Sequence, residues 1–411
     1  MFWSIELLYF VLMIAVFIVL LLWAKLPTGL ALMASAVTGF IFSAIISGTA
    51  FDIRYLVEGM FGYFDTILVI TTAMVFMGAM EACGALQYIS TLLVKLLGRF
   101  PSLLLIAFML IIMFPAMVTG SSLASAISAG ALVAPIMLKW GIPKSKTGAI
   151  IAIGSVLGMV APPVNVPAMV ICDVVDIPYT GFTLPLLLLA FPLAIISVLL
   201  LGRKYVKPLS KEDIPRVVDV SILKELNGTV CIPMLVLIVF IVLEMIFPKI
   251  FGALAMPAMF IISAVICFLV GRRYPFFKKR DKSLAVSQDD KPGSVIDIFR
   301  ESVYKSFSAM GLLVGVGMFM EIITLNGVRG YIVYIAISLP NIWQYVGMAV
   351  SLPLFGGISA FGSASMLGGP FVMALDGVCY SIMVTGGLSL LAALGEFSPP
   401  TAMSATFATN V

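Results

Sequence analysis

Long apolar stretches alternate with short polar segments along the whole chain. A helix needs about 20 mainly apolar residues to cross the hydrocarbon core of a bilayer. We predict membrane-spanning helices at 7–26, 30–49, 66–83, 183–202, 229–247, 250–270 and 309–324. The alternation of apolar and polar residues that is typical of membrane β-barrels is missing from the sequence. The pattern therefore predicts an all-α integral membrane protein that crosses the bilayer many times.

The composition supports this class and excludes several others. Hydrophobic residues make up 62% of the 411 residues and charged residues only 11%, whereas soluble proteins carry about 25% charged residues. The chain has no histidine, which excludes zinc–histidine sites and Ser–His or Cys–His catalytic pairs. Five scattered cysteines are expected to be small buried residues, and a net charge of +4 is too small to indicate nucleic-acid binding. We expect no enzyme activity and no cofactor.

Four apolar segments are interrupted in their middle. Gly and Ser residues break 101–139 and 340–375, whereas Pro-Pro pairs break 147–171 and 379–411. We interpret the first two as re-entrant helical hairpins, because each side of the break is short for a full crossing, and the last two as broken transmembrane helices. Two short, tilted helices that each cross the bilayer remain the alternative to each hairpin.

The distribution of basic residues tests this layout. With the N-terminus outside and both hairpins returning to their side of entry, all but three of the 24 Lys and Arg residues lie inside. The exceptions are Arg54, Lys249 and Arg329. A single crossing by 101–139 would move the basic loops that follow to the outside, against the positive-inside rule. The sequence therefore favours an external N-terminus.

Three short motifs occur twice, in the same order. The earlier copies are CGALQYI (83–89), Gly120-Ser121-Ser122 and GMVAPP (158–163); the later ones are NGVRGYI (326–332), Gly362-Ser363-Ala364-Ser365 and GEFSPP (395–400). We infer a first repeat at 1–205, a cytoplasmic linker at 206–228 and a second repeat at 229–411. The predicted sides make the two copies opposite in orientation, which is typical of secondary transporters with alternating access. Amphipathic stretches at 52–63, 85–98, 293–307 and 328–339 predict helices in the membrane interface.

The four breaks predict a binding site, because irregular backbone at membrane depth needs protein, water or a ligand as its partner. We expect them to meet near the bilayer midplane. Proline frees a carbonyl one turn earlier, and such carbonyls with Ser, Thr and Asn oxygens suit sodium, while helix N-termini suit a carboxylate. The predicted binding residues are Thr119, Gly120, Ser121, Ser122, Ser125, Pro162, Asn165, Gly362, Ser363, Ser365, Glu396, Pro399, Thr401 and Ser404.

Each of these residues also has a structural alternative. A membrane serine often bonds the carbonyl one turn back or permits close helix packing. Asn165 is the most specific prediction, because an amide at lipid depth is costly unless it is bonded. Glu396 could bind a cation, carry a proton or face a water-filled vestibule, and Glu81 and Glu321 are further acids predicted at depth.

The Gly-Ser-Ser tip, the G-x-x-x-P-P broken span and the inverted second copy resemble the large membrane subunit of tripartite ATP-independent periplasmic (TRAP) transporters, within the ion transporter superfamily. The resemblance covers nearly the whole chain and is strongest over 66–205. It implies sodium-driven uptake of organic anions such as dicarboxylates, keto acids or sialic acids, by an elevator-like movement. It also implies a bacterial inner membrane with a periplasmic N-terminus, a small four-helix membrane subunit and a periplasmic substrate-binding protein.

The same resemblance implies sodium ions at Gly120, Ser121, Asn165, Gly362, Ser365 and Thr401. Two departures matter. A further span is expected after the second Pro-Pro pair, so the final helix is expected to be missing from a chain that stops at Val411, and Glu396 stands where a neutral residue is expected. Proton coupling therefore stays open beside sodium coupling. A stand-alone symporter or antiporter of the superfamily is the close alternative, and a channel is a more distant one.

Overall fold

The computed structural model describes residues 5–47, 53–210, 212–247, 256–271, 295–375 and 380–398. All regular secondary structure in these ranges is helical, and eight of the helical segments are long and apolar enough to cross a membrane. The prediction of an all-α integral membrane protein is thus confirmed.

A helix overlaps every span predicted from the sequence, although residues 48–49 and 250–255 of two of these spans lie outside the described residues. These helices are α1 (Ile5–Leu22), α2 (Thr28–Ser47), α4 (Phe64–Ala82), α11 (Thr183–Gly202), α14 (Ile232–Ile246), α16 (Met256–Gly271) and α17 (Val295–Leu325). Three of the four amphipathic stretches also form helices of their own, namely α3 (Arg54–Phe61), α5 (Ala85–Leu97) and α18 (Val328–Ser338). Their location in the membrane interface stays a prediction.

The fourth amphipathic stretch differs from the prediction. The prediction of a separate helix at 293–307 is wrong, because α17 continues without interruption through the span that follows. Gly62 follows the last residue of α3 and separates that helix from α4, whereas Ser308 and Ala309 stand at the corresponding junction in α17. Without a glycine or proline there, the helical hydrogen bonds continue through the junction.

The two Gly/Ser-interrupted segments are each broken into shorter helices. The first comprises α6 (Pro101–Thr119), α7 (Ser122–Ser125), a π-helix (Ala126–Gly130) and α8 (Ala131–Lys139). The second comprises α19 (Asn341–Gly356), α20 (Ala360–Ser363), a π-helix (Ala364–Gly368) and α21 (Gly369–Ala374). Both halves of the first segment are themselves among the possible spans, so re-entry stays a prediction and the alternative stays open.

The first Pro-Pro pair separates α9 (Lys144–Val160) from α10 (Val166–Val175). In the second copy, α22 (Ser381–Leu394) and a 3₁₀ turn (Gly395–Phe397) precede the second pair, which lies outside the described residues. The linker contains two short helices, α12 (Ile214–Val217) and α13 (Ile222–Glu225), and a 3₁₀ turn (Gly228–Cys231) leads into α14.

The chain forms two compact units. Unit 1 comprises Met1–Ile67, Asn165–Pro185 and Phe307–Ala402, and unit 2 comprises Leu68–Val164, Leu186–Ser306 and Met403–Val411. Each unit contains segments from both halves of the sequence, so these units are a different division from the predicted repeats. The repeats stay a prediction.

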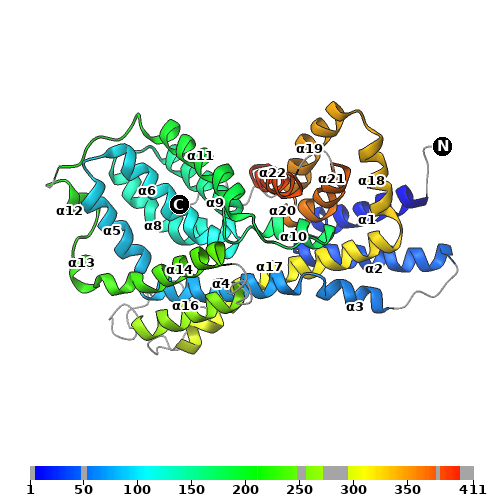
Figure 1. The fold of residues 1–411 in the computed structure, drawn as a ribbon, viewed down its shortest axis with the longest axis horizontal. Coiled ribbons are helices and arrows are strands. Elements are labelled where there is room, and N and C mark those ends of the chain that lie inside the picture. The colour runs from blue at the N-terminus through cyan, green and yellow to red at the C-terminus, as the bar shows by residue number, and fades with distance from the viewer. Residues whose placement is uncertain are drawn as a thin grey trace. The chain divides into compact units, whose positions relative to one another are not determined.

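In unit 2, α6 packs along α9, and α5 and α8 lie beside them (Figure 1). The crossing of α6 and α9 is close at Gly158, where an added Cβ would lie 2.5 Å from the Met113 carbonyl oxygen. Elsewhere in the unit, the buried thiols of Cys83 and Cys267 are in contact at 3.3 Å. Cys172 is a third buried thiol, whereas Cys231 is only half-buried, in contrast to the prediction, and Cys379 lies outside the described residues.

In unit 1, α1 packs against α2, and α19 crosses the end of α22 (Figure 1). At this second crossing, a Cβ on Gly395 would lie 2.4 Å from the Gly356 Cα. Gly158 and Gly395 are the first residues of the repeated GMVAPP and GEFSPP motifs. Both motifs therefore begin with a glycine that allows close packing, which gives their similarity a structural reason.

Candidate functional site

The predicted binding residues form two clusters, one in each unit. The unit 2 cluster contains Thr119, Gly120, Ser121, Ser122, Ser125 and Pro162. The unit 1 cluster contains Asn165, Gly362, Ser363, Ser365 and Glu396. Pro399, Thr401 and Ser404 lie outside the described residues. One pocket shared by both copies stays a prediction, and each cluster is described by itself.

The break in the unit 2 cluster follows from two residues. Gly120 ends α6 with a φ of 64°, a left-handed conformation in which glycine avoids the steric cost of a side chain. Ser121 is extended, and its Oγ accepts a hydrogen bond from the Ala124 amide at 3.3 Å, which caps α7. Ser122 is the first residue of α7 and is buried. The local sequence therefore determines both the end of α6 and the new helix N-terminus.

Buried hydroxyls surround this break. Thr119 Oγ1 donates to the Pro115 carbonyl at 2.7 Å, and Ser125 Oγ donates to the carbonyl of Ile112. Ser155 on α9 donates in turn to Ser125 Oγ at 3.2 Å. The sequence reasoning missed Ser155, although it is a polar residue inside the first broken segment, two turns before the Pro-Pro pair. The Pro-Pro break is also attached to α6.

This attachment includes a backbone hydrogen bond. The amide of Val164, the residue after Pro162-Pro163, donates to the Met117 carbonyl at 3.1 Å. Carbonyls near the end of α6 thus accept hydrogen bonds from Thr119, Ser125 and Val164. A bond to the carbonyl one turn back, the structural alternative, is made by Thr119, whereas Ser125 bonds a carbonyl 13 residues earlier and Ser121 caps a helix.

In unit 1, Asn165 caps α10 and is fully buried. Its Oδ1 accepts from the Ala168 amide at 3.0 Å, and its Nδ2 donates to Ser389 Oγ on α22 at 2.9 Å. Its main-chain amide donates to the Tyr179 hydroxyl at 3.3 Å. A buried amide needs such partners. The expectation that Asn165 is bonded is therefore confirmed, and its partners are protein groups. Its role as an ion ligand stays a prediction.

The second Gly/Ser break lies at Ser359, whose Oγ accepts from the Gly362 amide at 3.0 Å and caps α20. Gly362 and Ser363 therefore follow the break, and the residue in the same local position as Ser121 is Ser359. The sequence reasoning missed this serine. Its signal is the spacing from proline, because Pro115 and Pro353 each precede their capping serine by six residues.

Side chains beyond the break complete the unit 1 cluster. Ser363 Oγ donates to the Leu352 carbonyl at 2.7 Å, and Ser365 Oγ shares a hydrogen bond of 2.8 Å with the hydroxyl of Tyr63. A hollow in unit 1 is lined by Ser359, Gly362 and Ser363 together with the apolar Phe17, Leu32, Phe355, Ile358 and Met366. The second break therefore borders a small hollow in the protein.

Thr385 is a further residue that the sequence reasoning missed. It lies on α22 one turn before Ser389, is fully buried, and within the described residues its Oγ1 has no hydrogen-bond partner. Leaving a buried hydroxyl unpaired costs about 1–3 kcal/mol. The Thr385 hydroxyl is therefore suited to bind an ion or a substrate. The signal in the sequence is the helical spacing of Thr385 and Ser389 in the second broken segment.

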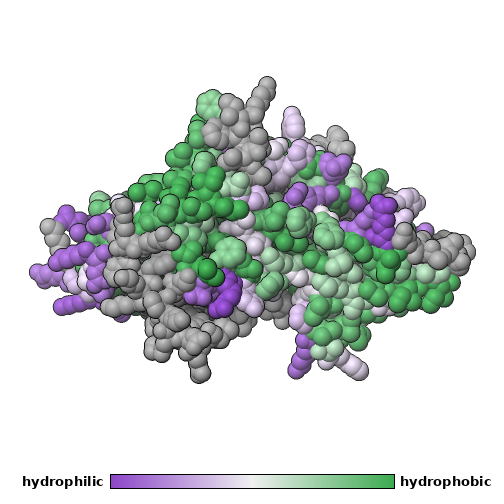
Figure 2. Space-filling view, turned by 90° about the horizontal axis from the view of Figure 1, so that it is seen from below, coloured by the Kyte–Doolittle hydropathy of each residue, from purple (hydrophilic) through white to green (hydrophobic). Residues whose placement is uncertain are grey.

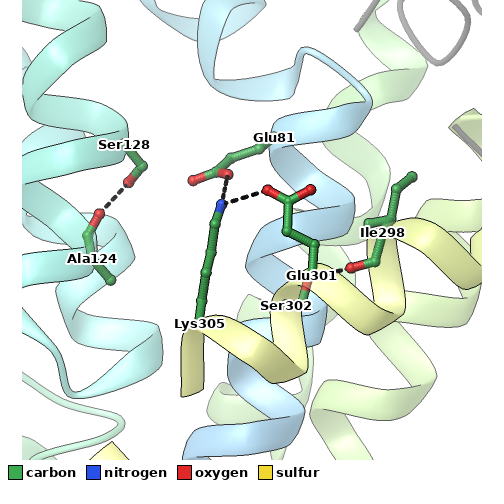
Figure 3. A network of polar contacts seen from close by, with 7 residues as sticks. All are labelled: Glu81, Ala124, Ser128, Ile298, Glu301, Ser302 and Lys305. Carbon is green, nitrogen blue, oxygen red and sulfur yellow. Dashed lines mark hydrogen bonds and ion pairs between the residues drawn. The ribbon is translucent and has the colours of Figure 1, made fainter. Parts of the chain in front are cut away.

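The acids predicted at depth have different surroundings. Glu81 forms an ion pair of 3.6 Å with Lys305 of α17, which also pairs with Glu301 at 3.3 Å (Figure 3). The carboxylate of Glu81 is thus already paired with a base. Glu321 and Glu396 are half-buried, Glu396 in the 3₁₀ turn after α22. A cation or proton role for Glu396 stays a prediction.

Comparison with known proteins adds the family. The family described as "Tripartite ATP-independent periplasmic transporter, DctM component" matches residues 14–411, whereas no curated protein matches the chain significantly. Its members are multi-pass membrane transporters of organic acids, not enzymes, and they work in a three-part system with a small membrane subunit and a periplasmic binding protein. Both units contain broken helices that cross a neighbour closely at a glycine. Together with these helices, this match shows that the chain belongs to the DctM family, the large permease component of TRAP transporters.

Proposed function

We propose that this permease takes up a small organic anion with sodium as the coupling ion, by elevator-like alternating access in a bacterial inner membrane. The observation that carries the proposal is the recurrence of one break: a serine-capped helix N-terminus followed by a five-residue π-helix, at Ser121 in unit 2 and at Ser359 in unit 1. Irregular backbone of this kind is tolerated in membrane proteins where it lines a cavity or a site.

Oxygen chemistry supports sodium as the cotransported ion. Thr119, Ser125 and Ser155 gather hydroxyl and carbonyl oxygens in unit 2, and Thr385 supplies a buried hydroxyl without a partner among the described residues of unit 1. Hard cations prefer such oxygen ligands. In this proposal each cluster binds its ion by exchanging some of the present hydrogen bonds for ion contacts.

The anion is recognised by dipoles and hydroxyls rather than by bases. No Lys or Arg occurs in either Gly/Ser tip or in GMVAPP and GEFSPP. The helix N-termini after Ser121, Ser359 and Asn165 carry partial positive charge, which suits a carboxylate. Dicarboxylates, keto acids and sialic acids all present this group, and the binding protein delivers one of them to a periplasmic face that also carries the N-terminus.

The test is uptake into proteoliposomes that contain the permease, its small subunit and the binding protein. A panel of radiolabelled organic acids is offered with an inward sodium gradient, a proton gradient or neither. We expect uptake only with sodium, and loss of uptake in a Ser121→Ala, Asn165→Ala double variant. Neutralising Lys278, Lys279 and Arg280 together is the control and leaves uptake unchanged.

Folding of the double variant is followed separately by its thermal melting. Sodium that binds the native state raises the melting temperature, and potassium does not. We expect this sodium-dependent increase in the wild type and its loss in the double variant. Normal uptake by the double variant would refute the site, uptake without the binding protein would favour the stand-alone transporter, and flux that never saturates would favour a channel.

A further inference from the structure

Several helix ends come together at one end of unit 2. Gly202, the last residue of α11, lies against α6 and α9, because an added Cβ would be 2.9 Å from a Leu105 methyl and 3.6 Å from a methyl of Ile150. Just after α8, Trp140 donates its indole N–H to the Lys207 carbonyl at 3.0 Å. The turn between α8 and α9 is thus attached to the segment that follows α11.

The start of α6 is attached to the same segment. The Leu209 amide donates to the Gly98 carbonyl at 2.8 Å, which holds the turn between α5 and α6 against residues 207–209. A Cβ on Gly141 would lie 3.6 Å from the Tyr205 carbonyl oxygen, which confirms the closeness of the α8–α9 turn. The end of α5, the starts of α6 and α9 and the ends of α8 and α11 therefore form one surface.

This surface is strongly basic, and we call it the basic end. Its members are Lys95, Arg99, Lys139, Lys144, Lys146, Arg203, Lys204 and Lys207, of which all but the half-buried Lys146 are exposed. Residues 82–172 and 177–211 contain no Asp or Glu. The adjoining α12–α13 segment carries Glu212, Asp213, Asp219 and Glu225, of which Asp213 pairs with Arg216 at 3.6 Å. Within the described part of the chain none of the eight bases forms an ion pair.

Exposed apolar side chains border the basic end. Near the α5–α6 turn, Leu96 directly follows Lys95 and Phe100 directly follows Arg99. On α11, Leu200 lies about one turn before Arg203, and 79% of the surface of Leu200 is exposed. Figure 2 shows hydrophilic residues gathered at the edge of unit 2 where α12 lies in Figure 1. A basic surface directly beside exposed apolar residues matches the boundary between lipid headgroups and acyl chains.

We propose that the basic end binds the phosphate of an anionic phospholipid of the inner leaflet, with the acyl chains against Leu96, Phe100 and Leu200. The charge arithmetic of the sequence assigns this end to the cytoplasmic side, where anionic lipids attract basic segments. A free phosphate would match the charge alone, whereas the apolar border matches a lipid. The site lies at the base of the first Gly/Ser-broken segment and is independent of the transported anion.

The experiment measures lipid binding to the purified permease in nanodiscs of phosphatidylcholine with added phosphatidylglycerol. The test variant is Lys144→Gln, Lys204→Gln, Lys207→Gln; the control is Lys25→Gln, Arg54→Gln, Arg300→Gln, which removes the same charge elsewhere. We expect native mass spectrometry to find phosphatidylglycerol retained by wild type and control, with affinity lower by about tenfold or more in the test variant. Equal retention by both variants would overturn the proposal.

Two further measurements distinguish lipid binding from misfolding of the variant and from binding of a free anion. Melting in pure phosphatidylcholine checks that the test variant is folded, and the single Lys207→Gln variant replaces it if it is not, with a smaller loss of retention expected. Inorganic phosphate at millimolar concentration is the second probe. Displacement of bound phosphatidylglycerol by phosphate alone would indicate a free-anion site and overturn the assignment to lipid, whereas unchanged retention supports it.

Discussion

The two Gly/Ser-broken segments share one backbone plan. In α6 to α8 and in α19 to α21, a helix ends near a capping serine and a five-residue π-helix follows. Ser125 and Ser363 occupy the same place before the π-helix, and each donates to a carbonyl of the preceding helix. Gly158 and Gly395 each allow a broken helix to cross that preceding helix closely.

The side-chain partners of the two segments differ. In the first segment Ser125 accepts a hydrogen bond from Ser155 on a broken helix. In the second segment a different position, Ser365, two residues after the counterpart of Ser125, bonds to Tyr63 between α3 and α4. The first segment ends at the basic residues around Lys139, and the second contains no charged residue between 340 and 375. The two segments thus share backbone geometry and packing, while their polar side-chain contacts differ. A ligand-binding residue identified in one segment therefore does not identify its counterpart in the other segment as a ligand-binding residue.

The largest expected effect tests the shared packing. Gly158→Val and Gly395→Val place a branched side chain where even a Cβ lies within 2.6 Å of backbone atoms. We expect each change to destabilise its unit by about 3 kcal/mol, since overpacking forces the backbone apart. Apparent melting temperature and the yield of monodisperse protein are the measurements.

Gly387→Ala is the matched control on α22, because a Cβ there meets nothing within 4 Å. It leaves melting unchanged or raises it slightly. If Gly158→Val or Gly395→Val melts like this control, the two crossings are not the shared packing feature.

A smaller effect is expected where the segments differ. Tyr63→Phe removes the hydroxyl that bonds Ser365 and leaves a buried hydroxyl with one partner fewer, at a cost of about 1–3 kcal/mol. Hydrogen exchange should then increase in residues 364–374 and stay unchanged in 126–139. Tyr380→Phe, at a side chain that is 82% exposed, serves as the control, and equal exchange in both variants would contradict the prediction.

The capping serines test equivalence at a finer level. Ser121→Ala and Ser359→Ala each remove a helix cap, for which we expect a similar loss of about 1 kcal/mol. Ser121→Asn and Ser359→Asn keep a capping oxygen and should restore most of the stability. Denaturant titration in mild detergent measures all four variants, and a loss confined to one serine would show that the breaks are not equivalent.

The smallest effect is expected at the ion pairs of Lys305. Lys305→Gln removes both contacts with Glu81 and Glu301, but these side chains are partly exposed and such pairs contribute about 1 kcal/mol or less (Figure 3). Added salt should reduce the difference from wild type in thermal melting. A loss as large as that of Gly158→Val would indicate that Glu81 needs its base at membrane depth.

Much of the fold could be predicted because local composition determines where membrane helices form. The span at 183–202 coincides with α11, and both Gly/Ser interruptions and the first Pro-Pro pair occur as breaks. The continuity of α17 was missed, because the change from a charged to an apolar stretch suggested the end of one helix and the start of another, and the backbone has no such end. At this junction a change in polarity did not end the helix, whereas Gly62 separates α3 from α4.

The site was harder to predict than the fold, since its contacts join distant parts of the chain. Asn165 was correctly expected to be bonded, but nothing in its neighbourhood names Ser389 as the partner. Tyr63 looks like an ordinary interfacial residue until the fold brings it to Ser365, 302 positions later. Local breaks can be found from spacing, whereas their hydrogen-bond partners depend on tertiary packing.

The Asn165–Ser389 hydrogen bond also has a consequence for biosynthesis. Its two residues are 224 positions apart, so more than half of the chain is translated between them. During that interval the local partner of the Asn165 oxygen, the Ala168 amide, is already in the chain, but Ser389, the partner of the side-chain NH₂ group, is not. The N-terminus of α10 therefore acquires its complete set of bonds only after α22 has left the ribosome.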